Sequence, residues 1–162
     1  MRKSKIYSFT SNFSNYDTLY KYAAILENMG NVTLVPIDIK KLLPKAKIYD
    51  EVLAARNNMD LKDLRRKRID MSDELIVYLN GKDHPCIAYE TIMDIIFAHE
   101  KKIDISIACD NMTIIDAIDS IEKATLGSIA IDIDGNRNIG LNGGYDIELT
   151  KINIKKSILQ TV

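Results

Sequence analysis

Three acidic side chains, Glu90, Asp94 and Asp83, are the candidates in this chain for nucleophilic or acid–base chemistry. They follow the apolar run at residues 75–79, which has the continuous hydrophobic character of a strand buried on both faces. In open parallel sheets, ligands bind outside the carboxyl ends of the strands. A carboxylate at that position can attack or stabilise an electron-poor sugar carbon, as paired carboxylates do in glycoside cleavage.

Each of these positions also has a non-catalytic interpretation. Glu90 lies near the start of a predicted helix at residues 87–100. The helix dipole favours an acidic residue at this position even where that residue has no catalytic role. Asp83 can protonate a leaving group, or it can be an ordinary turn residue. His84 can donate that proton instead, or it can be a solvated loop side chain. The spacing of the residues leaves these alternatives open.

Polar residues at the ends of the predicted strands are candidates for binding a substrate. Free backbone N–H groups favour anions at Thr10, Ser11 and Asn12, where the loop after the first strand opens a helix. That loop has no glycine, which argues against a close phosphate wrap of the P-loop kind. Arg65, within a basic run that we expect to be mostly solvated, is a further candidate for binding a phosphate group. Asn80 ends the central strand and is a candidate for binding the substrate.

The composition excludes several classes of protein. Lys and Arg total 22 against 23 Asp and Glu in 162 residues, so no strong field is present to gather a nucleic acid polymer or an anionic membrane. No segment has the pattern of a signal peptide or a membrane span. We expect one soluble, cytoplasmic domain over residues 1–162, with a small molecule as its partner.

Metal and cofactor sites are not expected. Cys86 and Cys109, the two cysteines, have neither metal-binding spacing nor the framework of a disulfide-rich protein. Residues 132–136 resemble the start of a calcium loop, but Gly143 occupies the twelfth position, where a glutamate is required.

The hydrophobic periodicity predicts a doubly wound, mostly parallel α/β sheet. Strands are predicted at residues 6–9, 32–35, 75–79, 103–108 and 128–133, and helices at about 15–29, 60–72, 87–100 and 112–123. Residues 37–58 are irregular and are assigned to a lid or connector. Asp134-Gly135 is a strong turn signal, so residues 127–156 are predicted to add an antiparallel β-hairpin to the sheet.

The chain resembles the nucleoside 2-deoxyribosyltransferase-like superfamily, which includes deoxynucleoside monophosphate N-glycosidases. The resemblance covers about residues 5–106. Beyond the first strand and its loop, it lies in Leu26-Glu27-Asn28-Met29-Gly30-Asn31-Val32, in Arg68-Ile69-Asp70-Met71-Ser72-Asp73-Glu74-Leu75-Ile76-Val77, and in Ala88-Tyr89-Glu90 before Ala98 and Lys101-Lys102-Ile103. It implies a Rossmann-like, flavodoxin-like fold and cleavage or transfer at the N-glycosidic bond of a deoxynucleoside or its 5′-monophosphate.

The resemblance implies that Glu90 is the nucleophile at the anomeric carbon and that Asp83 assists it. The segment from Glu90 to Ile103 is about half a turn longer than in the family, which makes Asp94 an alternative carboxylate. The family's Gly-Pro after the first strand is replaced by Thr10-Ser11-Asn12, and its glycine motif before the glutamate by Cys86-Ile87-Ala88.

The resemblance also implies a homo-oligomer, because active sites of this family are commonly completed across subunits. Three aromatic residues can stack a base or fill the core: Phe13, Tyr16 and Tyr89. The alternative function is a non-catalytic nucleotide-binding or nucleotide-sequestering protein on the same scaffold, since a fold does not by itself fix an activity.

Overall fold

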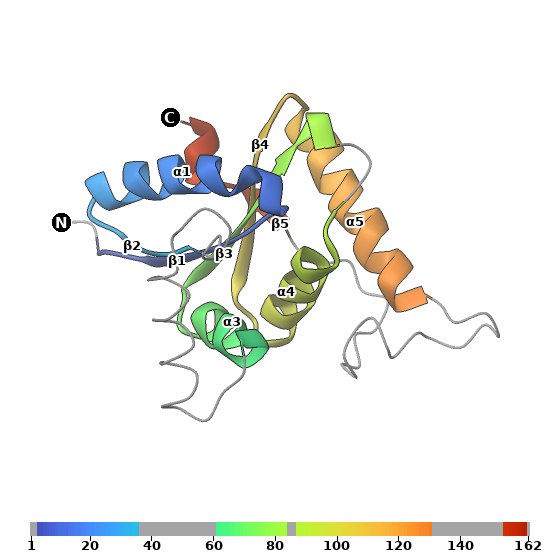
Figure 1. Cartoon of the computed structure of the whole chain (residues 1–162), viewed down its shortest axis with the longest axis horizontal. Coiled ribbons are helices and arrows are strands. Elements are labelled where there is room, and N and C mark those ends of the chain that lie inside the picture. Colours follow the sequence, from blue (N-terminus) through green and yellow to red (C-terminus); the bar gives the residue numbers. More distant parts are fainter. Residues whose placement is uncertain (1–2, 36–60, 84–86, 131–153, 162) are drawn as a thin grey trace.

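The computed structural model describes residues 3–35, 61–83, 87–130 and 154–161. These residues form a five-stranded sheet with helices on both faces (Figure 1). The strands are β1 (Ile6–Thr10), β2 (Val32–Leu34), β3 (Glu74–Asn80), β4 (Asp104–Asp110) and β5 (Ile154–Lys156), in the order β2-β1-β3-β4-β5. Every neighbouring pair is parallel. This order confirms the predicted doubly wound, flavodoxin-like sheet.

The helices divide between the two faces of the sheet (Figure 1). They are α1 (Tyr16–Asn28), α3 (Leu61–Asp70), α4 (Tyr89–Glu100) and α5 (Ile114–Ala130), with short 3-10 turns η1 (Phe13–Asn15), η2 (Gly81–Asp83) and η3 (Ile158–Thr161). α1 and η3 lie on one face, whereas α3 and α4 lie on the other. Among the described residues, no helix is long and apolar enough to cross a membrane.

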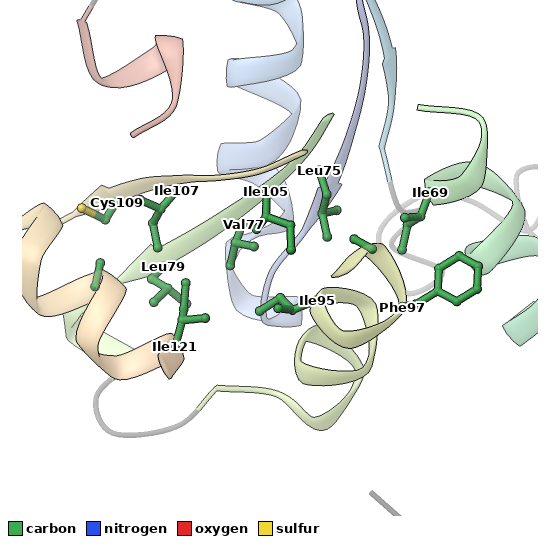
Figure 2. Close-up of a cluster of buried hydrophobic side chains, with 12 residues drawn as sticks. Ile69, Leu75, Val77, Leu79, Ile95, Phe97, Ile105, Ile107, Cys109 and Ile121 are labelled. Atoms are coloured by element: carbon green, nitrogen blue, oxygen red, sulfur yellow. The ribbon is translucent and has the colours of Figure 1, made fainter. Parts of the chain in front are cut away.

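The core has two halves because successive strand residues point to opposite faces of the sheet. Leu75, Val77 and Leu79 of β3 pack toward Ile95 of α4 and Ile121 of α5 (Figure 2). The alternate residues of β3 pack on the other face with α1. β3 is buried along nearly its whole length, as its continuous apolar run predicts.

The strand order places the switch point of the sheet between β1 and β3. The chain leaves β1 toward β2 on one side and then returns to β3 on the other. β1 ends at Thr10, whose neighbour in the register is Val77, and β3 continues to Asn80. Ligands of doubly wound sheets bind in the crevice outside the carboxyl ends at such a point.

The predicted strand that begins at Ser128 is wrong for the residues described. α5 continues from Ile114 through Gly127 to Ala130. One glycine costs a helix only about 1 kcal/mol, and each added residue gains a hydrogen bond, so Gly127 does not end this helix. Periodicity alone cannot distinguish a short apolar run in a strand from one in a helix.

The predicted antiparallel pairing at the end of the chain is also wrong. β5 runs parallel to β4, with Ile154 opposite Ile105 and Lys156 opposite Ile107. Parallel neighbours require a crossover of a dozen or more residues, which α5 and the chain between it and β5 supply. The Asp134-Gly135 turn and the predicted lid at 37–58 lie outside the described residues.

Truncation of the core is expected to destabilise the protein strongly. Ile107 is completely buried in β4, so Ile107→Ala is expected to lower the free energy of unfolding by about 2–5 kcal/mol. Ile115→Ala on α5 is the matched control, because Ile115 is 80% exposed and its truncation should change stability by no more than about 0.5 kcal/mol. Urea denaturation measures both variants. Equal losses would contradict the placement of the core.

Candidate functional site

A buried ion pair joins three elements at the carboxyl end of β1. Arg65 Nε on α3 donates to both carboxylate oxygens of Asp94 on α4, at 2.9 and 2.8 Å, and Arg65 Nη2 donates to Asp94 Oδ2 at 2.6 Å. Thr10 Oγ1 donates to the same Oδ2 at 2.6 Å. The Asp94 side chain is only 6% exposed. One carboxylate therefore holds β1, α3 and α4 together.

Burial and pairing act against each other in this cluster. Burial raises the pKa of Asp94 above its ordinary value, although the hydrogen bonds and charge of Arg65 oppose the rise. Burial alone would lower the pKa of Arg65, but the hydrogen bonds and charge of Asp94 prevail and raise it. The guanidinium that the sequence suggests for a phosphate is thus already paired with Asp94.

Tyr16 borders the ion pair from the first turn of α1. Its side chain is only 2% exposed and belongs to the core on the α1 face. Burial raises the pKa of Tyr16, Arg65 lowers it, and the charges of Asp94 and Glu90 raise it further. The sequence leaves two roles open for Tyr16, stacking on a base or filling the core, and this buried position is that of a core residue. The side chains of Phe13 and Tyr89 lie outside the described part of the structure.

Glu90 is exposed in the first turn of α4. It lies one turn before Asp94, and residues at this spacing share a helix face. Its charge contributes to the raised pKa values of Asp94 and Tyr16, which places it beside the buried pair. The structure therefore brings together Glu90 and Asp94. The side chain of Asp83 and the whole of His84 lie outside the described residues.

The polar loop after β1 is fastened to its surroundings by its own side chains. Ser11 Oγ donates to the Tyr78 carbonyl of β3 at 2.8 Å, and Asn15 Nδ2 donates to Ser11 Oγ at 3.0 Å. Asn12 Oδ1 accepts a hydrogen bond from the Ala88 N–H at 2.8 Å, immediately before α4. These contacts fix the loop against the start of the helix that carries Glu90.

The ends of β3 and β4 are joined in a similar way. Asn80 Oδ1 accepts hydrogen bonds from the Lys82 N–H at 3.1 Å and from Asn111 Nδ2 at 2.9 Å. A Cβ atom on Gly81 would overlap with the Asn111 carbonyl, so only glycine fits there. Asn111 itself has a φ of 58°, a left-handed conformation that asparagine tolerates better than most residues.

Sequence reasoning missed a second polar cluster, on the α1 face of the sheet. Tyr22 and Tyr78 donate their hydroxyl protons to Asp110 Oδ2, at 2.9 and 2.6 Å. Tyr22 and Tyr78 lie 88 and 32 residues from Asp110 in the sequence, so no local sequence motif predicts the cluster. The available signal was the position of Asp110 at the end of an apolar strand, a position that Asn80 has in β3. The pairing of Arg65 with Asp94 was likewise hidden by a separation of 29 residues.

Breaking the buried ion pair is expected to be costly, whereas replacing it entirely is not. Arg65→Met should lower the free energy of unfolding by about 3–5 kcal/mol, because Asp94 stays buried without its charged partner. The double variant Arg65→Met/Asp94→Leu should recover most of that loss, since no buried charge remains. Chemical denaturation of both single variants and the double variant completes the double-mutant cycle.

The control is the same cycle on Asp119 and Lys123 of α5. This pair has a similar distance of 2.8 Å, but its side chains are 55% and 76% exposed. No measurable coupling is expected there, because water screens exposed pairs. Coupling of equal size in the two cycles would contradict the burial of Asp94.

A pH dependence is expected from Tyr22. Burial, the hydrogen bond to Asp110 and the charge of Asp110 raise its pKa from 10.0 to about 12. Its contribution to stability is therefore complete below about pH 10 and is lost as the pH rises toward 12. Tyr22→Phe should show a smaller fall in unfolding free energy over this range than the wild type. Denaturant titrations at stepped pH values measure the difference, and parallel curves would contradict the hydrogen bond.

No family model matches the chain, and no curated protein matches it. Among solved structures, the fold is similar to 2-deoxyribosyltransferase from the psychrotolerant bacterium Bacillus psychrosaccharolyticus, with a TM-score of 0.44 and 10% sequence identity, over 80% of this chain and 93% of that chain.

Proposed function

We propose that the protein cleaves or transfers the N-glycosidic bond of a deoxynucleoside or its 5′-monophosphate, with Glu90 as the nucleophile. The observation that carries the proposal is the exposed Glu90 carboxylate in the first turn of α4, one turn from the buried Asp94–Arg65 pair. This position lies beside the carboxyl end of β1 at the switch point of the sheet. The sequence resemblance to the nucleoside 2-deoxyribosyltransferase-like superfamily supports the same assignment.

The reaction requires a carboxylate that is free to approach the sugar. Glu90 attacks the anomeric carbon, the bond to the base breaks, and the base leaves with the bonding electron pair. An acid then protonates the leaving base, and we assign that role to Asp83. Water or a second base then takes the sugar from Glu90.

The environment of the two neighbouring acids favours Glu90 over Asp94 as the nucleophile. Asp94 Oδ1 accepts a hydrogen bond from Arg65, and Asp94 Oδ2 accepts hydrogen bonds from Arg65 and Thr10, so both oxygens are engaged by the protein. Glu90 is exposed to solvent. We therefore assign Asp94 as a positioning residue, which fixes α4 against β1 and so fixes the place of Glu90.

The charge of the cluster suits a sugar that becomes positive during bond cleavage. Arg65 carries one positive charge, while Asp94 and Glu90 each carry a negative charge when ionised. The remaining negative charge can stabilise an electron-poor anomeric carbon, because preorganised charges act where charge develops. The proposal includes a homo-oligomer in which a neighbouring copy completes the site.

A second candidate function is nucleotide binding without turnover. The specific observation in its favour is that the polar side chains around Glu90 already satisfy one another. Thr10, Ser11 and Asn12 bond to Asp94, to β3 and to the start of α4, as side chains of a scaffold do. On this alternative, the protein retains a nucleotide without releasing the base.

Release of free base tests the proposed function. Purified protein incubated with deoxynucleosides and their 5′-monophosphates is expected to release base, and Glu90→Ala should lower the rate by about 10³-fold or more, as loss of a nucleophile does in other enzymes. Glu100→Ala is the matched control, because Glu100 is an exposed glutamate at the opposite end of α4. Unchanged release in Glu90→Ala would overturn the proposal. Tight ligand retention without release would favour the binding alternative.

A further inference from the structure

Residues 154–161 lie along the outer edge of β4, and we name this segment the strap. Its first part, β5, pairs with only three residues of β4, from Ile105 to Ile107. The chain then turns into η3, which lies on the α1 face of the sheet (Figure 1). Because β5 runs parallel to β4, the strap extends from the amino edge of the sheet toward its carboxyl edge.

An ion pair anchors the first end of the strap. Lys155 Nζ lies 3.0 Å from Glu74 Oε1 and 3.4 Å from Asp104 Oδ2. The Glu74 side chain is only 4% exposed, whereas that of Lys155 is 51% exposed. Lys5 is a second cation near the same carboxylate, but it is more distant, at 3.9 Å, and lies outside the strap. Salt should screen this anchor, because its lysine is half in solvent.

Apolar packing and hydrogen bonds anchor the second end of the strap. Leu159 is 5% exposed and belongs to the core on the α1 face. The Ser157 N–H donates to the Ile107 carbonyl at 2.9 Å, and the Cys109 N–H donates to Gln160 Oε1 at 3.0 Å. The Gln160 side chain thus takes the place of a neighbouring strand at a residue of β4 that β5 does not pair with.

The strap differs from the central strands in how firmly it is held. β3 is buried along nearly its whole length and has a strand on each side. β5 is a three-residue edge strand in which Lys155 and Lys156 are exposed. Segments with few buried contacts open at a lower free energy than the core does. The two anchors are joined by a few residues of backbone, so release of one withdraws support from the other.

We propose that residues 154–161 are a strap that opens as one unit while the rest of the fold stays intact, and that the Lys155 ion pair is its latch. Opening breaks the hydrogen bond of the Cys109 N–H, next to Asp110, and uncovers the outer edge of β4. A charge interaction at the amino edge of the sheet is thereby coupled to the carboxyl edge. This device requires no substrate and is independent of the proposed function.

Native-state hydrogen exchange of the full chain, followed by NMR, tests the strap. Two amide groups report on it: Ser157 N–H, within the strap, and Cys109 N–H, on β4. Both are expected to show the same protection factor and the same weak dependence on urea, because one small opening breaks both hydrogen bonds. Their protection should be about 100-fold or more below that of the slowest β3 amides, which exchange through global unfolding.

Variants at the two anchors test whether the strap moves as a unit. Lys155→Met is expected to lower the protection of both Ser157 and Cys109 by about fivefold, the upper range for a partly exposed ion pair. Salt at about 1 M should lower both protection factors in the wild type, and this salt effect should be smaller in Lys155→Met. Leu159→Ala should lower both by about 30-fold or more, because a buried side chain is lost.

Lys5→Met is the matched control, because it removes a cation from the same Glu74 carboxylate without altering the strap. The protection of Ser157 and Cys109 should be no lower in this variant than in the wild type. Circular dichroism checks that each variant is folded.

Two results would overturn the proposal. If Ser157 and Cys109 exchange with the protection and urea dependence of the β3 amides, the strap opens only when the whole protein unfolds. If Lys155→Met lowers the protection of Ser157 but not that of Cys109, the contacts fray separately and there is no cooperative unit.

Discussion

The buried pair of Arg65 and Asp94 is the interaction on which the arrangement of the site depends. It joins α3 to α4, and Thr10 adds the end of β1 to the same carboxylate. Taking two charges out of water costs nearly as much as their attraction returns, so a pair of this kind adds little net stability. Its consequence is geometric, because only one mutual placement of the three elements satisfies both charges. Because Glu90 lies one turn earlier on α4, the same placement also fixes its position.

The two acids on α4 illustrate how environment divides the roles of similar side chains. Glu90 and Asp94 share a helix face, but Asp94 is buried and hydrogen-bonded while Glu90 is exposed. A carboxylate whose oxygens are occupied by donors serves structure, and one that is open to solvent can meet a substrate. In the proposed site, the buried acid therefore positions the accessible one.

The two ends of the sheet use polar residues for different purposes. At the amino end, the buried Glu74 accepts a hydrogen bond from Ser106 at 2.7 Å and pairs with Lys155 at 3.0 Å, which fastens the edge strand β5 to the sheet. At the carboxyl end, Glu90 is exposed. Among the residues that the structure describes, none donates a hydrogen bond to Asp110 Oδ1. Groups that are satisfied by the protein hold it together, whereas groups left open can recognise a ligand.

Much of the fold was determined by local sequence. The apolar run of β3 and the helical periodicity before and after it predicted the central strand, its neighbours and the parallel order, because burial on one or both faces leaves a period that can be read directly. The sequence likewise placed Glu90 at the start of α4. It did not determine the continuation of α5 through Gly127 or the parallel direction of β5, since short segments carry too little periodicity and strand direction depends on the whole crossover. Only the tertiary structure decided that Arg65 pairs with Asp94 and that two tyrosines hold Asp110, because those partners are distant in sequence and meet only when the sheet and its helices are packed.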